Sequence, residues 1–266
     1  TTDPVRLKIA ADAAELIQQS GYLKNGMSFQ TGASGTSLAV ADDVRRRMKE
    51  QQLVGSFGLG GIHAYFVKML EEGLFRALLD TQCFDLDAVA SAGRNENHMA
   101  ISGSQSANPH PRGPVVNALD VVILGATEID VDFHVNVVTG SNGVIMGASG
   151  GHSDCAAGAK LTIIVANLTR KNFCVVRERV TTVTTPGETV DALVTERGIA
   201  INPRRTDLLA AVRDSGLPIV DIHRLKALGE ELVGPQQQAD CDGPIVAVVE
   251  YRDGTVIDLV HRQPSY

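Results

Sequence analysis

Apolar residues recur along this chain with two periodicities that alternate from one segment to the next. Over Arg6–Gln19 they follow the spacing i, i+3, i+4, i+7, which indicates one buried face of a helix. The same spacing predicts helices around Val40–Met48, His63–Leu70, Thr206–Arg213 and Asp221–Leu232. Helices are therefore expected along the whole length of the chain.

Short apolar runs rich in β-branched residues separate these helices. Leu119–Leu124 and Leu161–Val165 are continuous runs, which is typical of central strands buried on both faces. Near the C-terminus, Asp253-Gly254 lies between two such runs and predicts a β-hairpin. Other strands are predicted at Met27–Thr31, Leu53–Leu59, Val131–Val138 and Phe173–Val180, and the polar segment Asn95–Val115 is expected to be a long surface loop.

The alternation of strands and helices predicts an α/β fold, with a mainly parallel sheet flanked by helices and a C-terminal hairpin. A length of 266 residues fits a single domain spanning 1–266. Hydrophobic residues make up 44% of the chain and aromatic residues only 4%. The core must therefore be built from Val, Ile, Leu and Ala, as in strands covered by helices on both faces.

Charge and motif content exclude several classes of protein. The chain has 24 Lys and Arg against 31 Asp and Glu, and no basic stripe, which argues against nucleic-acid binding. The 4 cysteines are scattered without a CxxC pair, so we expect neither a disulfide framework nor a thiolate zinc site, and a reducing cytoplasm fits best. No apolar run reaches the ~18 residues of a membrane span. No HExxH motif or close histidine cluster points to a metal.

Glycine is concentrated where predicted strands end. The segment 139–154 is rich in glycine and serine, and two further corners, GASG at 32–35 and the pair Gly60-Gly61, each separate a predicted strand from a predicted helix. Because helix N-terminal amides attract anions, these corners together predict one anion-binding edge; the alternative is ordinary loops between strands. The spacings of a nucleotide phosphate loop, a dinucleotide fingerprint and a serine nucleophile elbow do not occur.

Three segments resemble a known family: LDVVILGATEID at 119–130, TGSNGVIMGASGGHSDCAAGAKLTIIVANL at 139–168, and TTPGETVDALVTERGIAINPRR at 184–205. The chain is similar to the C-terminal half of the citrate lyase α chain, the citrate CoA-transferase component, and more broadly to the CoA-transferase superfamily. The resemblance extends over nearly the whole sequence. It implies a mainly parallel sheet, a transferase that exchanges thioesters, and a family chain roughly twice this length whose amino-terminal half is absent here.

The chain departs from the better-known CoA-transferases at one position. Those enzymes attack the acyl-CoA with a glutamate on the turn between a strand and a helix, and that position falls at about Gly60 here. Because glycine has no side chain, a covalent enzyme-CoA intermediate is not expected. The resemblance then implies that a citrate carboxylate attacks the acetyl thioester directly, within a ternary complex. Acetate would leave by way of a mixed anhydride, and the released thiol would capture the citryl group.

The resemblance also implies the partners. The thioester carrier would be CoA or the CoA-derived prosthetic group of an acyl carrier protein, with no permanently bound cofactor and no metal. The chain would assemble with the β (lyase) and γ (acyl carrier) chains of citrate lyase and with the missing amino-terminal half, as an oligomer in the cytoplasm.

A tetrahedral oxyanion needs fixed hydrogen-bond donors, and glycine-rich loops offer free backbone N–H groups. We assign that role to Gly150 and Gly151, with Gly60 and Gly61 as second candidates. His152 lies in the same loop and is the first candidate for contact with the substrate; alternatively it hydrogen-bonds loop carbonyls.

The three carboxylates of citrate require cationic or donor side chains, for which arginine offers a planar fork. Asp154 orients His152 or caps the next helix, while Arg94 and the Glu196–Arg197 pair have the alternative of being solvated surface charges. The substrate-binding candidates are Arg94, His98, Arg112, Asp154 and Arg197.

A last group concerns the thioester carrier. Glu128 follows a buried strand, at the edge where open α/β sheets bind ligands, and a structural or CoA-positioning role is favoured for it. The candidates for contact with CoA or the carrier thioester are Ser34, Gly35, Glu128, Asn142 and Gly147.

Two other functions fit the same pattern. A sugar-phosphate isomerase or deaminase would use a poised acid or base and a phosphate site at the GASG corner. A non-catalytic assembly half would only dock its partner half and other subunits. Fold analogy does not separate these alternatives from the transferase.

Overall fold

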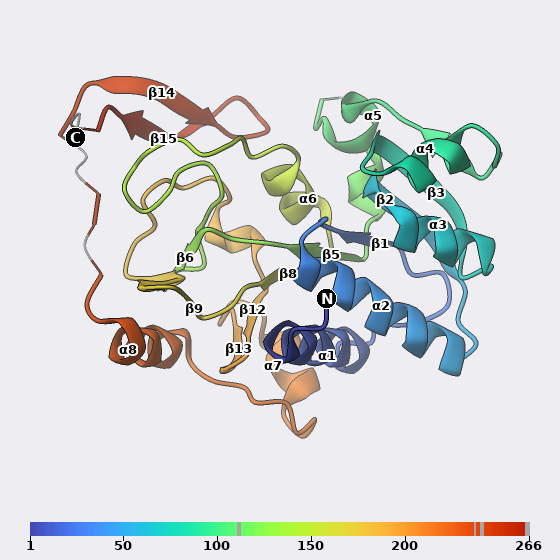
Figure 1. Cartoon of the computed structure of the whole chain (residues 1–266), viewed down its shortest axis with the longest axis horizontal. Coiled ribbons are helices and arrows are strands. Elements are labelled where there is room, and N and C mark those ends of the chain that lie inside the picture. Colours follow the sequence, from blue (N-terminus) through green and yellow to red (C-terminus); the bar gives the residue numbers. More distant parts are fainter. Residues whose placement is uncertain (111–112, 237, 240–241, 264–266) are drawn as a thin grey trace.

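The computed structural model describes residues 1–110, 113–236, 238–239 and 242–263. Its main element is an eight-stranded sheet with the strand order β13-β12-β8-β5-β1-β2-β3-β4 (Figure 1). All neighbouring strands run parallel except β12 and β13. The strands span β1 Phe29–Thr31, β2 Gly55–Ile62, β3 Phe75–Cys83, β4 His98–Ala100, β5 Val121–Leu124, β8 Leu161–Val165, β12 Ala192–Thr195 and β13 Gly198–Ile201.

Helices cover both faces of this sheet because successive strand residues point to opposite sides. In β5, Val121 and Ile123 pack with α1, α2, α3 and α7, while Val122 and Leu124 pack with α6, α8 and η1. Each of these four side chains is buried, and burying one such side chain is worth about 1.5–3 kcal/mol. The helices span α1 Pro4–Gln19, α2 Gly35–Glu50, α3 Ala64–Glu71, α4 Leu86–Ala92, α5 Gly103–Ala107, η1 Val115–Ala118, α6 His152–Gly158, α7 Thr206–Val212 and α8 Ile222–Val233.

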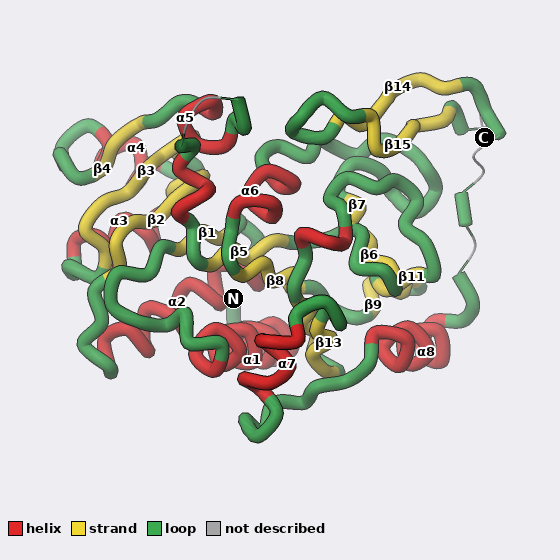
Figure 2. The backbone as a smooth tube through the Cα atoms, turned by 180° about the vertical axis from the view of Figure 1, so that it is seen from behind, coloured by secondary structure: helices red, strands yellow, loops and turns green. Residues whose placement is uncertain are grey.

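Smaller sheets complete the structure on the side of α6 and α8. A three-stranded sheet has the order β11-β6-β7, β9 pairs with β10, and β14 pairs with β15 as a hairpin. Figure 1 shows this hairpin above the main sheet with its turn directed toward α5, and Figure 2 shows α8 beside the three-stranded sheet. The elements are β6 Glu128–Asp130, β7 Val135–Asn136, β9 Thr169–Arg170, β10 Phe173–Cys174, β11 Val176–Arg177, η2 Gly187–Thr189, β14 Ile245–Glu250 and β15 Val256–His261.

The predicted fold class, the five helices and the C-terminal hairpin are confirmed, and four local predictions are wrong. The strand expected over Val131–Val138 is reduced to β7, because Phe133 has a φ of 67° and the chain turns there. The strand expected over Phe173–Val180 is divided between β10 and β11, which pair with different strands. Gly60 and Gly61 lie within β2 and not in a turn after it. The segment 95–115 contains β4 and α5 and is not one long loop.

No helix in the described part of the chain is long and apolar enough to cross a bilayer.

Candidate functional site

A cavity of about 990 Å³ lies where four parallel strands of the main sheet end. The carboxyl ends of β1, β2, β3 and β5 form its floor, and α5, the start of α6 and the hairpin turn form its walls. Open α/β sheets bind ligands at this edge, and the volume suits a small organic ligand. The cavity lining includes Gln30, Gly60, Gly61, Phe84, Ser104, Ser106, Asn108, Gly150, Gly151, His152, Asp154, Cys155 and Arg252.

The floor is built from glycines because other side chains pack against their backbone. Gly60 has a φ of 104°, and a Cβ there would lie 2.9 Å from Nε2 of Gln30. A Cβ at Gly61 would overlap the ring of Phe84. The backbone of β2 is therefore exposed to the cavity with no side chain at either position.

Gly150 and Gly151 come directly before α6. Gly150 has a φ of 53° and open space where a Cβ would be, and Gly151 is the N-cap residue of the helix. Within the described residues, neither of their N–H groups donates a hydrogen bond to the protein. Two backbone donors at the cavity wall are thus free to bind an anion or an oxyanion.

His152 is held by the protein through both ring nitrogens. Nε2 lies 2.8 Å from the carbonyl oxygen of Gly125, and Nδ1 lies 2.7 Å from the hydroxyl of Thr185. Because a carbonyl only accepts, Nε2 carries the proton and Nδ1 accepts from Thr185. Burial lowers the pKa of His152 to about 4, so the ring is neutral at neutral pH. The geometry matches the alternative of hydrogen bonding to a loop carbonyl and makes His152 a fixed part of the cavity wall.

Arg252 is the cationic residue that sequence reasoning missed. It lies in the turn between β14 and β15, where its Nη2 donates to the carbonyl of Ala107 at 2.7 Å. Its Nε has no hydrogen-bond partner among the described residues and lies 3.5 Å from Oδ1 of Asp154. The Arg252 side chain is only 11% exposed and contributes a guanidinium to the cavity lining. No local sequence signal connects this turn to the cavity.

Asp154 was predicted at the site and lines the cavity. It is the one carboxylate among the lining residues that the structure describes. Burial raises its pKa, while the neighbouring Arg252 opposes that shift. The pair of Asp154 and Arg252 joins α6 to the hairpin turn across one side of the cavity.

The thiol of Cys155 also lines the cavity, but its chemistry is unsuited to nucleophilic attack. It accepts a hydrogen bond from Nε2 of Gln30 at 3.0 Å. Burial raises its pKa to about 11, so the thiol stays protonated at neutral pH. Because the thiolate is the reactive form, Cys155 is a structural residue here.

Helix α5 forms a neutral polar wall of the cavity, in a segment that was expected to be a surface loop. Its start is fixed by a capping box, in which Ser102 accepts from the backbone of Gln105 and the Gln105 side chain accepts from the backbone of Ser102. Ser104, Ser106 and Asn108 from this helix and its end line the cavity.

Several predicted substrate residues lie outside the cavity lining. Arg94 is 65% exposed and pairs with Glu71 at 3.0 Å. Arg197 is 51% exposed and lies 3.8 Å from Glu196 at the turn between β12 and β13. His98 is buried at the start of β4 and does not line the cavity. Arg112 lies outside the described residues.

The predicted carrier residues are not part of the cavity lining either. Ser34 caps α2 by accepting from the backbone N–H of Ser37 at 3.1 Å, and Gly35 is the first residue of that helix. Asn142 accepts from the backbone N–H of Val144 at 3.2 Å, and Gly147 lies further along the same loop.

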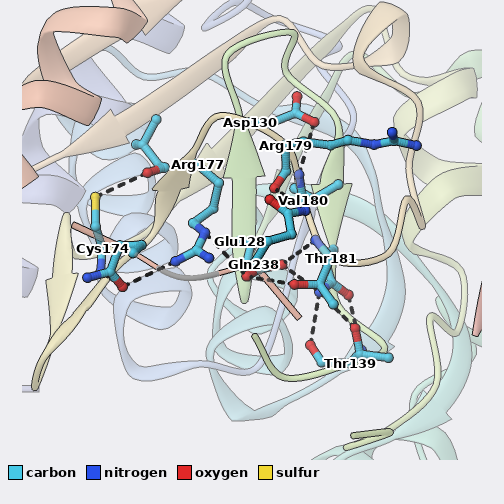
Figure 3. Close-up of polar contacts among 12 residues, drawn as sticks. Glu128, Asp130, Thr139, Cys174, Arg177, Arg179, Val180, Thr181 and Gln238 are labelled. Atoms are coloured by element: carbon cyan, nitrogen blue, oxygen red, sulfur yellow. Dashed lines mark hydrogen bonds and ion pairs between the residues drawn. The ribbon is translucent and has the colours of Figure 1, made fainter. Parts of the chain in front are cut away.

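Glu128 is the centre of a buried polar network that supports this loop (Figure 3). Its carboxylate is fully buried and accepts from the backbone N–H of Thr181 at 2.8 Å and from Asn136 at 2.9 Å. Nε of Arg177 lies 3.7 Å from its other oxygen. Asn136 also donates to the carbonyl of Thr139, where the glycine-rich segment begins. Glu128 therefore stabilises the base of the loop that carries Gly150 and Gly151.

These features define an α/β protein with a ligand cavity at the carboxyl edge of a parallel sheet. The same fold occurs at low sequence identity in RipA from Yersinia pestis, with a TM-score of 0.60 and 16% identity over 87% of this chain and 54% of that one. It also occurs in a malonate decarboxylase alpha subunit from Acinetobacter baumannii, with a TM-score of 0.56 and 13% identity over 87% of this chain and 56% of that one.

The sequence model of the citrate lyase alpha subunit family (CitF) matches residues 1–263, and the chain belongs to this family. It is 50% identical to the citrate lyase alpha chain of Klebsiella pneumoniae over 98% of this chain and 52% of that protein. It is 47% identical to the citrate lyase alpha chain of Escherichia coli (strain K12) over 98% of this chain and 51% of that protein. A crystal structure of the putative alpha subunit of citrate lyase from Streptococcus mutans, in complex with citrate, matches with a TM-score of 0.97 and 44% identity over 100% of this chain and 52% of that one. The chain thus spans about half the length of these relatives.

Proposed function

We propose that this chain forms the thioester-exchanging half of a citrate CoA-transferase, in which an acetyl thioester and citrate give a citryl thioester and acetate. The observation that carries the proposal is the cavity, because it combines the guanidinium of Arg252 with two backbone N–H groups, at Gly150 and Gly151, that have no partner in the described part of the chain. Support comes from the Streptococcus mutans relative, which was crystallised with citrate and matches this chain along its whole length.

The reaction requires no nucleophile from the protein. A citrate carboxylate oxygen attacks the thioester carbonyl of the acetyl donor, and the tetrahedral oxyanion collapses with loss of the thiolate to give a citric-acetic anhydride. The thiolate then attacks the citryl carbonyl of the anhydride, and acetate leaves with the oxygen that bridged the two acyl groups. Citrate is already ionised at neutral pH, so no general base is needed for the first attack.

The protein contributes position and charge stabilisation. Holding both reactants in attack geometry is worth about 7–11 kcal/mol. Each backbone donor aimed at the oxyanion is worth about 2.7–4 kcal/mol, the role proposed for Gly150 and Gly151. Arg252 binds a citrate carboxylate, while the hydroxyls of Ser104 and Ser106 and neutral His152 shape the remaining wall.

The geometry supports the direct route over a covalent enzyme intermediate. Gly60 has no side chain, and the Cys155 thiol is protonated at neutral pH. Asp154 is the remaining carboxylate on the described lining, and it lies beside Arg252. In the direct route it holds Arg252 in place, so an Asp154→Asn enzyme keeps part of its activity.

The proposal also includes the thioester carrier and the other chains of citrate lyase. The thioester carrier is CoA or the CoA-derived prosthetic group of the γ (acyl carrier) chain, and the β (lyase) chain cleaves the citryl thioester. In this proposal the half of the relatives' α chain that this sequence does not cover completes the carrier site, within a cytoplasmic oligomer. Ser34, Gly35, Asn142 and Gly147 remain candidates for that larger surface.

Mass-spectrometric detection of citryl-CoA from acetyl-CoA and citrate tests the proposal. The assay uses this chain alone and then this chain mixed with the half of the Klebsiella pneumoniae α chain that it does not cover. Citryl-CoA formation supports the transferase. Citrate binding without exchange under either condition, with exchange by the complete Klebsiella chain as the control, would favour the non-catalytic assembly half.

A further inference from the structure

The end of β3 has an irregularity that brings two reactive side chains together. In the pairing of β2 with β3, Gly60 is opposite Asp80 and Gly61 is opposite Gln82, so Thr81 is an extra residue in β3. Residues i and i+3 of a regular strand point to opposite faces, whereas a β-bulge re-aims the side chains that follow it. As a result Sγ of Cys83 lies 2.8 Å from Oδ2 of Asp80.

A third group reaches the same point from the neighbouring strand. His98 begins β4, where it pairs with Leu78 of β3, and its Nε2 lies 3.2 Å from Oδ2 of Asp80. Its Nδ1 lies 3.0 Å from the hydroxyl of Ser91, a fully buried residue of α4. One sulfur, one oxygen and one nitrogen from Asp80, Cys83 and His98 all lie within 4.8 Å of one another.

We propose that Asp80, Cys83 and His98 bind a divalent transition-metal ion of the zinc type. Zinc takes thiolate, imidazole and carboxylate ligands, whereas magnesium and calcium take oxygen ligands, so the donor set selects the former. Three protein ligands leave a fourth tetrahedral position for water or another group. Ser91 is the partner that such a site needs at the far ring nitrogen, because Nδ1–H donating to its hydroxyl leaves Nε2 free to coordinate.

The two distances to the Asp80 oxygen require only a small adjustment. Ligand atoms bound at ~2.0–2.3 Å to a tetrahedral ion lie about 3.3–3.7 Å from one another. Sγ of Cys83 at 2.8 Å and Nε2 of His98 at 3.2 Å from the same Asp80 oxygen must therefore move apart by less than about 1 Å. Cys83 is only partly buried and is the last residue of its strand, so it has room to do so.

The competing interpretation is a hydrogen-bonded triad with no affinity for a metal. In that case the Cys83 thiol and the His98 Nε2–H both donate to Asp80 and only fasten the short edge strand β4 to β3. The two interpretations differ in one measurable property, which is stoichiometric binding of a thiophilic ion.

The position connects such an ion to the cavity. Thr81 and Gln82, which lie between the ligands Asp80 and Cys83 in the sequence, and Phe84, which follows Cys83, line the cavity. An ion bound by the ligands would therefore fix the wall that carries Phe84. This inference is independent of the proposed transferase reaction.

Titration with Co²⁺, a spectroscopic substitute for zinc, tests the site in the whole chain. We expect one equivalent to bind, with the thiolate-to-cobalt charge-transfer absorption of a cysteine ligand. Cys83→Ser should abolish that absorption, and Ser91→Ala should weaken binding about 10- to 100-fold. Cys174→Ser and Cys241→Ser, which remove other thiols, are the matched controls and should keep it.

A measurement on the unaltered protein guards against variants that fail to fold. The alkylation of Cys83 by iodoacetamide is measured by peptide mass spectrometry. Zn²⁺ should slow this alkylation, whereas Mg²⁺ should not. Absence of Co²⁺ binding, charge-transfer absorption that persists in Cys83→Ser, or alkylation of Cys83 that Zn²⁺ leaves unchanged would overturn the proposal in favour of the hydrogen-bonded triad.

Discussion

Arg252→Gln is the substitution that separates the site seen in the structure from the site expected from the sequence. The guanidinium donates to Ala107 at 2.7 Å through Nη2, and its Nε is buried 3.5 Å from Oδ1 of Asp154, which leaves the charge at the cavity lining. A hydrogen bond from a charged group is worth about 1.5–3 kcal/mol, so the loss of one or two contacts to a citrate carboxylate should cost about 3 kcal/mol. That cost corresponds to a Kd for citrate raised by roughly 100-fold.

The assay is isothermal titration of citrate into the purified chain, because binding is measured whether or not the chain turns over. Arg252→Lys keeps the charge without the planar fork and should give an intermediate loss, about tenfold. Arg94→Gln is the matched control, since Arg94 is exposed and paired with Glu71 outside the cavity, and should leave the affinity unchanged. An unaltered Kd in Arg252→Gln, or a larger loss in Arg94→Gln, would refute the assignment.

Four further substitutions test the remaining parts of the site. Gly150→Val places a side chain at a φ of 53° and beside the oxyanion donors. The substitution should lower the free energy of unfolding by about 1–2 kcal/mol and abolish thioester exchange. Normal turnover in this variant would remove the loop from the mechanism. Glu128→Gln should lower the free energy of unfolding in urea by about 1.5–3 kcal/mol, because charge-assisted hydrogen bonds are lost, and an unchanged midpoint would contradict that role. Burial lowers the pKa of His152 to about 4, so the unfolded chain binds this proton at a higher pH than the folded chain does, and the free energy of unfolding falls as the pH drops from about 6.5 to about 4. His152→Gln should remove about 2–3 kcal/mol of that pH dependence, measured by denaturant unfolding. An identical pH profile for the variant would show that His152 does not contribute. Asp154→Asn should keep measurable exchange, and complete loss with citrate affinity intact would indicate a covalent role for this carboxylate.

The fold was predictable from sequence because its signals are local. The runs Leu119–Leu124 and Leu161–Val165 are apolar on both faces, and the structure places them as adjacent central strands β5 and β8. The prediction failed where a single residue reverses the chain. Val131–Val138 alternates like a strand, but the turn at Phe133 allows only two residues to pair.

Glycines of the cavity lining, together with His152 and Asp154, were named from the sequence, whereas Arg252 was not. Gly150 and Gly151 follow from the concentration of glycine at a strand end. Arg252 meets Ala107 across 145 residues of sequence, and no local pattern records that contact. The same holds for Cys83 and His98, which become neighbours only through a bulge in β3 and its pairing with β4.

In the proposed reaction citrate itself is the nucleophile. The most direct measurement is a single turnover of acetyl-CoA with citrate labelled with heavy oxygen in its carboxylates, using this chain combined with the complementary half of a citrate lyase α chain. Direct attack transfers one labelled oxygen from citrate to acetate in that first turnover and leaves the protein unlabelled. Unlabelled acetate, together with heavy oxygen in a protein carboxylate such as Asp154, would contradict the account and establish a covalent enzyme intermediate.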